Sequence, residues 1–252
     1  MAGAALRGRL TWLVGEVVDL VEETPGARSI TLDAPGWPGH LPGQHVDVRL
    51  TAEDGYQAQR SYSLAAPAEG ERVALTVERV PDGEVSGYLL DELRLSDRFE
   101  LRGPIGAYFV WTPDRGGPLL LVGAGSGVVP LMAMVRHRVR SGSQVPVLLL
   151  LSSRSWERII YRTELDRLSR DEGGVRIVHA LTRSQPPGWT GYGRRVDREM
   201  LAEVAPSPGE RPLCFVCGPT RFVEAVATNL VELGHEAARV RTERFGPTGG
   251  GG

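Results

Sequence analysis

The glycine-rich stretch after Val122 places the tightest constraint on what this chain can fold into. A short apolar run is followed at once by Gly123, Gly125 and Gly127. Apolar residues then recur at helical spacing as far as Val135, so the order is strand, tight turn, helix. The first amides of such a helix lack partners and carry a partial positive charge, which suits a phosphate group. The sequence therefore predicts a β–turn–α unit able to bind a phosphate.

This turn departs from the common dinucleotide fingerprint. The third glycine of G-x-G-x-x-G falls on Val128. Instead, Gly127 closes the turn and Pro130 follows, at a position where the first turn of a helix tolerates proline. The stretch taken alone also fits a plain glycine-rich β–α turn, so the rest of the chain has to decide between the two.

The bulk composition indicates a globular protein and excludes several classes of partner. The 252 residues can form one large domain or two of ordinary size, with 41% hydrophobic residues to build a core. A net charge of -2 gives no reason to expect nucleic acid or an anionic membrane as a partner. No apolar run has the length of a membrane span, and the first residues lack the apolar core of a signal peptide. We therefore expect no nucleic acid partner, no membrane partner and a cytoplasmic location.

Cys214 and Cys217 are the two cysteines of the chain. Two thiolates are too few for a plant-type iron–sulfur cluster, so such a centre would lie on another protein. Their C-x-x-C spacing is also found in redox dithiols and in half of a metal site. The pair lies inside an apolar strand pattern with no nearby histidine, which favours core packing. We expect no metal and a reducing, cytoplasmic environment.

The first half of the chain is predicted to form short antiparallel strands. β-Branched or alternating residues, separated by turn clusters, occupy 12–21, 27–32, 45–50, 60–65, 73–80 and 98–101. One helix interrupts them, with Ser86 as its expected N-cap. Several short strands at close spacing are typical of an antiparallel barrel or sandwich.

The pattern changes at the turn-rich segment 111–118. From there strands alternate with helices, the strands being expected at 119–122, 145–151, 175–181, 213–216 and 238–242. This alternation predicts a parallel sheet covered by helices on both faces. The predicted domains are therefore 7–113 and 114–246, followed by a flexible glycine tail at 247–252.

Five short motifs accompany the glycine turn, and each has a place in one order along the chain. They are Arg60-Ser-Tyr62-Ser63, Gly83-Glu-Val-Ser86, Gly103-Pro104-x-Gly106, Cys217-Gly218-Pro219 and Glu243-Arg-Phe245. In this order, and over nearly the whole chain, the set resembles the ferredoxin–NADP reductase superfamily. The resemblance implies two domains: an antiparallel β-barrel that binds FAD, followed by an α/β doubly wound parallel-sheet domain that binds NAD(P).

The resemblance assigns the FAD site to the first two motifs. The expected FAD-binding residues are Arg60, Tyr62, Ser63, Gly83, Val85 and Ser86. A guanidinium at Arg60 can bond a pyrophosphate in bidentate fashion, and Tyr62 offers a flat face to the isoalloxazine ring. The family places Ser63 near flavin N5, although simple alternation puts it on the opposite side of the strand from Tyr62. A surface charge, a strand aromatic and a plain helix cap are the structural alternatives for these positions.

The resemblance also assigns the nucleotide site and the hydride-transfer residues. The expected nucleotide-binding residues are Gly123, Gly125, Gly127, Pro130, Ser153, Arg154, Arg183, Cys217, Gly218 and Pro219. Cys217 is expected beside nicotinamide C4, with a buried inert thiol as the alternative. Glu243 and Phe245 are expected after the last strand, folding back so that the carboxylate relays a proton and the ring covers the flavin. Ser63, Cys217 and Glu243 are thus the expected catalytic residues.

The residues after the second strand of the nucleotide domain bear on the choice of nucleotide. NAD sites commonly carry an acidic residue there, which bonds the ribose 2′-OH. Here Ser153 and Arg154 offer donors, and Arg183, Arg194 and Arg195 add positive charge. The pattern favours NADPH, while a solvated arginine face and the neighbouring Glu157 leave NADH open.

The resulting hypothesis is a flavoprotein reductase. It takes a hydride from NADPH onto FAD and passes single electrons to a separate acceptor such as ferredoxin or an oxygenase component, and it is expected to be a monomer. Two alternatives remain: a flavin or quinone reductase with a small diffusible acceptor, and a regulatory module that binds both cofactors without catalysis.

Overall fold

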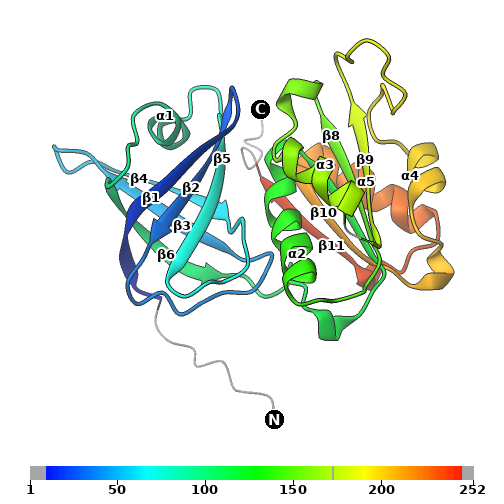
Figure 1. Cartoon of the computed structure of the whole chain (residues 1–252), viewed down its shortest axis with the longest axis horizontal. Coiled ribbons are helices and arrows are strands. Elements are labelled where there is room, and N and C mark those ends of the chain that lie inside the picture. The colour runs from blue at the N-terminus through cyan, green and yellow to red at the C-terminus, as the bar shows by residue number, and fades with distance from the viewer. Residues whose placement is uncertain (1–9, 172, 246–252) are drawn as a thin grey trace, which may run out of the picture.

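The computed structural model describes residues 10–171 and 173–245. The two predicted domains lie side by side, the strands of the first on the left and the mixed domain on the right (Figure 1). The predicted outer domain limits at residues 7 and 246 and the predicted tail at 247–252 lie outside the described residues. Within the described ranges, no helix is long and apolar enough to cross a membrane.

The first domain is a closed antiparallel barrel. Its strands are β1 (Trp12–Thr24), β2 (Ala27–Asp33), β3 (His45–Thr51), β4 (Gln57–Ser63), β5 (Arg72–Glu78) and β6 (Arg98–Ile105), in the order β4-β3-β6-β1-β2-β5. The edge strands β4 and β5 meet through a bridge between Leu64 and Leu75, which closes the sheet. Alternate residues of β5 such as Val73, Leu75 and Val77 are fully buried in the barrel core, as period-two alternation requires.

The α-helix of the barrel, α1 (Glu84–Asp91), begins earlier than predicted. Gly83 is its N-cap, with extended φ and ψ and no side-chain cap, so the prediction of Ser86 as N-cap was wrong. Ser86 is buried in the first turn, where its hydroxyl donates to the Gly83 carbonyl (3.1 Å) and accepts from the Val80 amide (3.2 Å). The serine therefore closes the turn that leads into the helix.

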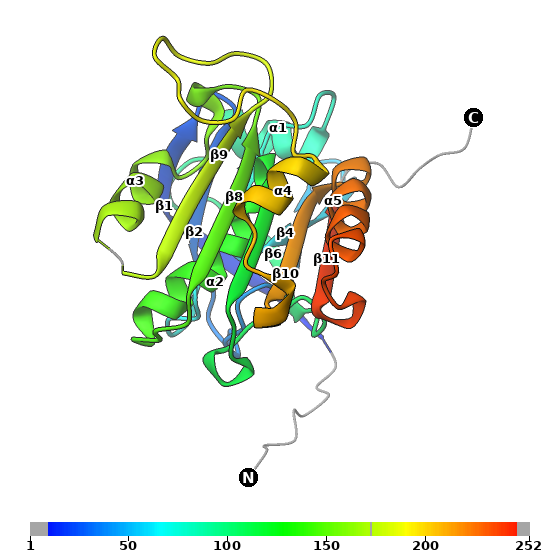
Figure 2. The same cartoon turned by 90° about the vertical axis from the view of Figure 1, so that its right-hand side faces the viewer.

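The second domain is a parallel sheet with helices on both faces. Its strands are β7 (Leu119–Ala124), β8 (Val147–Ser153), β9 (Val175–Leu181), β10 (Leu213–Pro219) and β11 (Val240–Phe245), in the order β11-β10-β7-β8-β9. Its helices are α2 (Val128–Arg140), α3 (Arg162–Asp171), α4 (Arg198–Val204) and α5 (Thr220–Glu232). In Figure 2, α4 and α5 cover the outer face of the sheet, while α2 and α3 lie between the sheet and the barrel. The structure confirms the predicted fold class of a barrel followed by a doubly wound domain.

Helix α3 begins at Arg162 and is separated from the 3₁₀ turn that precedes it. Residues Trp156–Arg158 form a separate 3₁₀ turn, and Tyr161 has a φ of 62°. A left-handed residue interrupts a right-handed helix, so the two segments cannot be continuous.

The two faces of the parallel sheet belong to two apolar cores. Leu149 and Leu151 of β8 face the core around α2 and α3, whereas Leu148 and Leu150 face the core around α4 and α5. The first of these cores also contains Ala65, Phe109 and other residues from the barrel side. The domain interface is therefore a continuation of a buried core.

The order of the strands reverses between β7 and β10, which is where open α/β sheets bind ligands. The glycine turn follows β7, and Cys217 lies near the carboxyl end of β10. A Cβ at Gly127 would lie 2.2 Å from the carbonyl oxygen of Cys217. Packing of the start of α2 against β10 thus requires glycine at position 127.

Replacement of Gly127 should therefore destabilise the fold. We expect Gly127→Ala to lower the free energy of unfolding by roughly 2–4 kcal/mol, because the new methyl group meets the backbone of β10. Gly87→Ala is a matched control in α1, where a Cβ meets nothing within 4 Å, and should stabilise by about 0.5–1 kcal/mol. Urea unfolding of both variants measures the difference, and similar values for the two would contradict the packing at Gly127.

Candidate functional site

The predicted flavin residues lie on the edge strand β4. Arg60 and Tyr62 are opposite Val48 and Val46 of β3, so they share the side of the sheet that faces the barrel core. Arg60 remains exposed, and its guanidinium donates to the neighbouring Gln59 carbonyl (2.6 Å). Tyr62 packs against the core, and burial raises its pKa to about 12. The tyrosine therefore stays protonated and offers its ring as an apolar surface.

Ser63 lies on the opposite side of β4, as alternation predicts. Its partner across the strand pair is His45, the first residue of β3. At His45 this side of the sheet contacts the second domain, since His45 Nδ1 lies 3.6 Å from Glu243 Oε1. His45 is thus the strand partner of Ser63 and a side-chain contact of Glu243, two residues predicted from distant motifs.

Glu243 and Phe245 belong to β11, so the prediction that they follow the last strand was wrong. Strand β11 continues to Phe245 because it pairs in parallel with β10. In that register Glu243 is opposite Cys217 and Phe245 is opposite Pro219. Strand pairing, and not a folded-back chain end, therefore places Glu243 beside Cys217 at the domain interface.

The Glu243 carboxyl has an unusual environment. Its Oε2 atom is buried, with no hydrogen-bond partner among the described residues. Burial raises the pKa of Glu243 to about 7 and lowers the pKa of His45, which nearby Asp47 partly opposes. A neutral imidazole next to a half-ionised carboxyl can hold or release a proton near neutral pH.

Sequence reasoning missed His45. It stands in an ordinary strand pattern, and its partner Glu243 is in the other domain. A local sequence signal for this contact does not exist, because the two strands meet only when the domains pack together.

Cys217 is fully buried near the end of β10. Burial raises the pKa of its thiol well above the ordinary value, and the charge of Glu243 acts in the same direction. The thiol therefore stays protonated and fills space at the interface. In the parts of the chain that are described, no group of three or more His, Cys, Asp or Glu residues could hold a metal ion.

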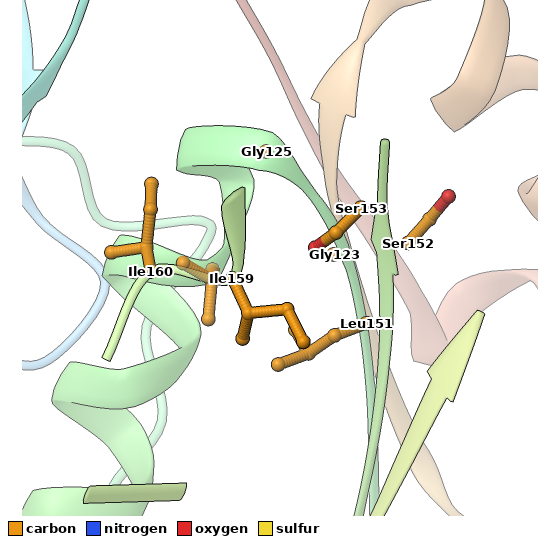
Figure 3. Close-up of a pocket in the computed structure, with 8 residues that line it drawn as sticks. Gly123, Gly125, Leu151, Ser152, Ser153, Ile159 and Ile160 are labelled. Carbon is orange, nitrogen blue, oxygen red and sulfur yellow. The ribbon is translucent and has the colours of Figure 1, made fainter. Parts of the chain in front are cut away.

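The glycine turn opens onto a small pocket at the carboxyl ends of β7 and β8. Its lining includes Gly123, Gly125, Leu151, Ser153 and Ile160 (Figure 3). In Figure 3 the Ser153 hydroxyl points toward the glycine turn, whereas Ser152 points to the other side of β8. Pro130 is buried in the first turn of α2, where the sequence predicted it.

The loops after β8 and β9 are bonded to each other and carry the predicted arginines. The Arg183 amide donates to the Arg154 carbonyl (2.9 Å), and both side chains are exposed. Arg194, by contrast, pairs with Asp197 at 2.7 Å and with Glu199 at 3.2 Å. The rim of positive charge is therefore formed by Arg154 and Arg183, with the charge of Arg194 engaged at the start of α4.

The residues present fit both cofactors expected from the sequence. The exposed guanidinium of Arg60 and the apolar ring of Tyr62 suit a pyrophosphate and an aromatic ring system. The unpartnered Oε2 of Glu243 offers a hydrogen-bonding atom at the interface. The glycine turn and Ser153 suit a second, phosphate-containing ligand on the other side of that interface.

Comparison with known proteins decides the family. The chain matches the family model of the oxidoreductase FAD-binding domain over residues 30–110 and that of the oxidoreductase NAD-binding domain over residues 121–228. It is 32% identical to NADH-cytochrome b5 reductase 1 of Aspergillus terreus over an alignment of 205 residues that covers 78% of this chain and 68% of that protein. The chain belongs to the ferredoxin–NADP reductase-like flavoprotein reductases.

Reductase components of oxygenase systems are among the relatives of this reductase. It is 31% identical to the glycine betaine monooxygenase reductase subunit of Pseudomonas aeruginosa, over 94% of this chain and 66% of that protein. The solved structure of the Amycolatopsis cytochrome P450 reductase GcoB superposes with a TM-score of 0.81 at 29% identity, over 94% of this chain and 71% of GcoB. The chain spans about two thirds of the length of these two relatives. The family to which it belongs makes it an NAD(P)H-dependent flavoprotein enzyme.

The raised pKa of Glu243 predicts a pH-dependent stability. The folded protein holds this proton up to about pH 7, whereas the unfolded chain releases it near 4.5, so stability falls as pH rises through that window. We expect Glu243→Gln to match the parent protein at pH 4.5 and to be more stable at pH 8, by roughly 1–3 kcal/mol.

Urea unfolding at the two pH values measures this effect. Glu224→Gln, at an exposed position of α5, is the matched control and should shift stability equally at both. A Glu243→Gln variant whose advantage does not grow with pH would contradict the buried, raised carboxyl.

Proposed function

We propose that this reductase oxidises NADPH in the cytoplasm and passes single electrons through FAD to a separate redox protein, a ferredoxin or an oxygenase component. The observation that carries the proposal is the contact between His45 of the barrel and Glu243 of the second domain. His45 is the strand partner of Ser63, while Glu243 is the strand partner of Cys217, which itself pairs with Gly123 at the glycine turn. We place the domain boundary at residues 113 and 114, between the two matched regions 30–110 and 121–228.

The barrel residues would bind and orient FAD. Arg60 would neutralise the pyrophosphate, and the first amides of α1, at Val85 and Ser86, would donate to it from the turn at Gly83. The side chains of Val85 and Ser86 are buried, so they contribute their backbone alone. FAD, when bound, supplies the redox chemistry that accepts a hydride and releases electrons one at a time.

The residues at the interface would exclude water and manage the proton. Cys217 fills the end of β10 with an un-ionised thiol, which keeps water from the nicotinamide position. Glu243 would hold or release a proton at its unpartnered Oε2, with a pKa of about 7 that suits both directions at neutral pH. Ser63 would donate from β4, and Phe245, at the end of β11, would shield the ring system.

The rim formed by Arg154 and Arg183 supports NADPH as the donor. Two exposed guanidinium groups on bonded loops suit a 2′-phosphate. NADH is the second candidate, because Glu157 is exposed nearby and the Aspergillus relative carries NADH in its name.

The relatives support a protein acceptor. One is the reductase subunit of a monooxygenase and another is a cytochrome P450 reductase. Both extend beyond the region shared with this chain, so delivery of electrons to such a partner is part of the proposal.

An anaerobic stopped-flow experiment tests the function. The purified, FAD-loaded protein is mixed with NADPH or NADH while the flavin absorbance near 450 nm (roughly where oxidised flavins absorb) is followed. We expect rapid bleaching, faster with NADPH. A bound flavin that neither nucleotide bleaches would refute hydride transfer and favour a binding module.

Removal of the Arg154 guanidinium should change the choice of nucleotide. We expect Arg154→Ala to raise the KM for NADPH about tenfold and the KM for NADH less than about twofold, because a charged hydrogen bond to the 2′-phosphate is lost. Arg140→Ala, at the far end of α2, is the matched control and should affect neither KM. Equal effects on the two nucleotides would show that Arg154 does not contact the 2′-phosphate.

A further inference from the structure

One side of strand β5 in the barrel is docked against the nucleotide domain. Ala74 packs against the core around α2 and α3, and the Thr76 hydroxyl hydrogen-bonds the hydroxyl of Tyr161, just before α3. Glu78 is two residues further along β5 and points to the same side. The position of its carboxylate is therefore set by a strand that is anchored to the second domain.

The Glu78 carboxylate contacts the phosphate-binding turn. Its Oε2 accepts a hydrogen bond from the Ser126 amide (2.7 Å), within the 3₁₀ turn Gly125–Gly127 that opens α2. A Cβ at Gly125, where φ is 55°, would lie 2.8 Å from the same oxygen. Neither this 3₁₀ turn nor the first turn of α2 has an acidic residue or a side-chain cap of its own. A carboxylate from the other domain thus satisfies the amide.

Two anions have to compete for this turn. The amides and the positive end of α2 suit the pyrophosphate of a nicotinamide dinucleotide, and the Glu78 carboxylate already accepts from one of them. In a partly buried site of low effective dielectric, a carboxylate and a pyrophosphate at contact distance repel each other strongly. Bound nucleotide therefore requires the carboxylate to move away.

We propose that Glu78 is a built-in competitor for the phosphate-binding turn, one that the nucleotide displaces on binding and that weakens the binding of NADPH and NADH by the same factor. This inference rests on the proposed function, in which the glycine turn binds the nucleotide. Equal weakening follows because both nucleotides carry the same pyrophosphate. As the oxidised nucleotide begins to dissociate, the carboxylate takes the Ser126 amide before the pyrophosphate can rebind, which speeds product release.

Displacement of Glu78 leaves the domains joined. The Thr76–Tyr161 contact remains, and the Arg136 guanidinium donates to the Ala65 carbonyl (2.5 Å) from α2 to the barrel. The carboxylate can thus move by side-chain rotation while β5 stays docked.

The test compares Glu78→Gln with the parent protein. The amide side chain has nearly the same shape and can still accept from Ser126, but it carries no charge. Isothermal titration of the FAD-loaded protein with NADP⁺ and with NAD⁺ gives the affinities. We expect both to bind about tenfold more tightly, which equals about 1.4 kcal/mol, and to dissociate more slowly in stopped-flow displacement.

Glu71→Gln is the matched control. Glu71 also accepts from a glycine amide, that of Gly36 (2.6 Å), at an exposed position of the same barrel. The Glu71→Gln variant loses the same charge and weakens the same kind of hydrogen bond. Its affinity for both nucleotides should therefore equal that of the parent protein. Glu78→Asp serves as a second variant, since the shorter side chain withdraws from the Ser126 amide and should give a smaller gain.

The outcomes separate the two proposals. Unchanged binding of both nucleotides by Glu78→Gln and Glu78→Asp would overturn the competitor role. Weaker binding would also overturn it and would indicate that Glu78 contacts the nucleotide directly. A gain for one nucleotide only would also overturn it, because the pyrophosphate is common to both. A parent protein and variants that bind neither nucleotide would refute the proposed function itself.

Discussion

The structure depends most on the position of β10 between β7 and β11. Hydrogen bonding on both sides brings three carboxyl-terminal strand ends to one edge of the sheet, each with a different group. The glycine turn comes from β7, Cys217 from β10 and Glu243 from β11. The close approach of Gly127 to the Cys217 carbonyl then fixes where α2 begins. A change in this strand order would separate the glycine turn from the Glu243 carboxyl.

The barrel contributes to the site from the other side of the interface, through two polar contacts of different kinds. His45 meets Glu243 as a neutral ring beside a carboxyl that its raised pKa leaves half-ionised near neutral pH. Glu78 meets the Ser126 amide as a carboxylate at the positive end of a helix. The His45–Glu243 contact suits a group that exchanges a proton. The Glu78–Ser126 contact suits an anion that another anion can displace. The His45–Glu243 and Glu78–Ser126 contacts lie at the border of an apolar core that is continuous between the domains. This core holds β3 and β5 in position.

Much of the fold could be predicted from local pattern. Alternation in β5 and β8, the apolar spacing of α2 and the turn clusters between elements depend on neighbouring residues, and the structure places these elements close to where the sequence predicts them. The predictions that were wrong concern chain geometry at the ends of elements. Ser86 has the residue type of an N-cap but lies inside the helix, because Gly83 adopts the extended conformation before it. Glu243 and Phe245 belong to β11, because β10 offers them strand partners as far as Pro219.

The sequence by itself determined the two-domain order, the glycine turn, the Arg60–Tyr62 pair on one side of a strand and the family, because each follows from residue type and short-range spacing. The tertiary structure alone decided which distant groups meet. The sequence around His45 does not predict its contact with Glu243. The sequence around Glu78 likewise indicates only a glutamate at the end of a strand, and its contact with the glycine turn forms when β5 packs against the second domain. Burial, and with it the raised pKa of Glu243, arises from surfaces that come together only when the domains pack. Pairwise contacts across an interface have no sequence period. For that reason the raised pKa of Glu243 and the position of the Glu78 carboxylate at the glycine turn are properties of the folded chain.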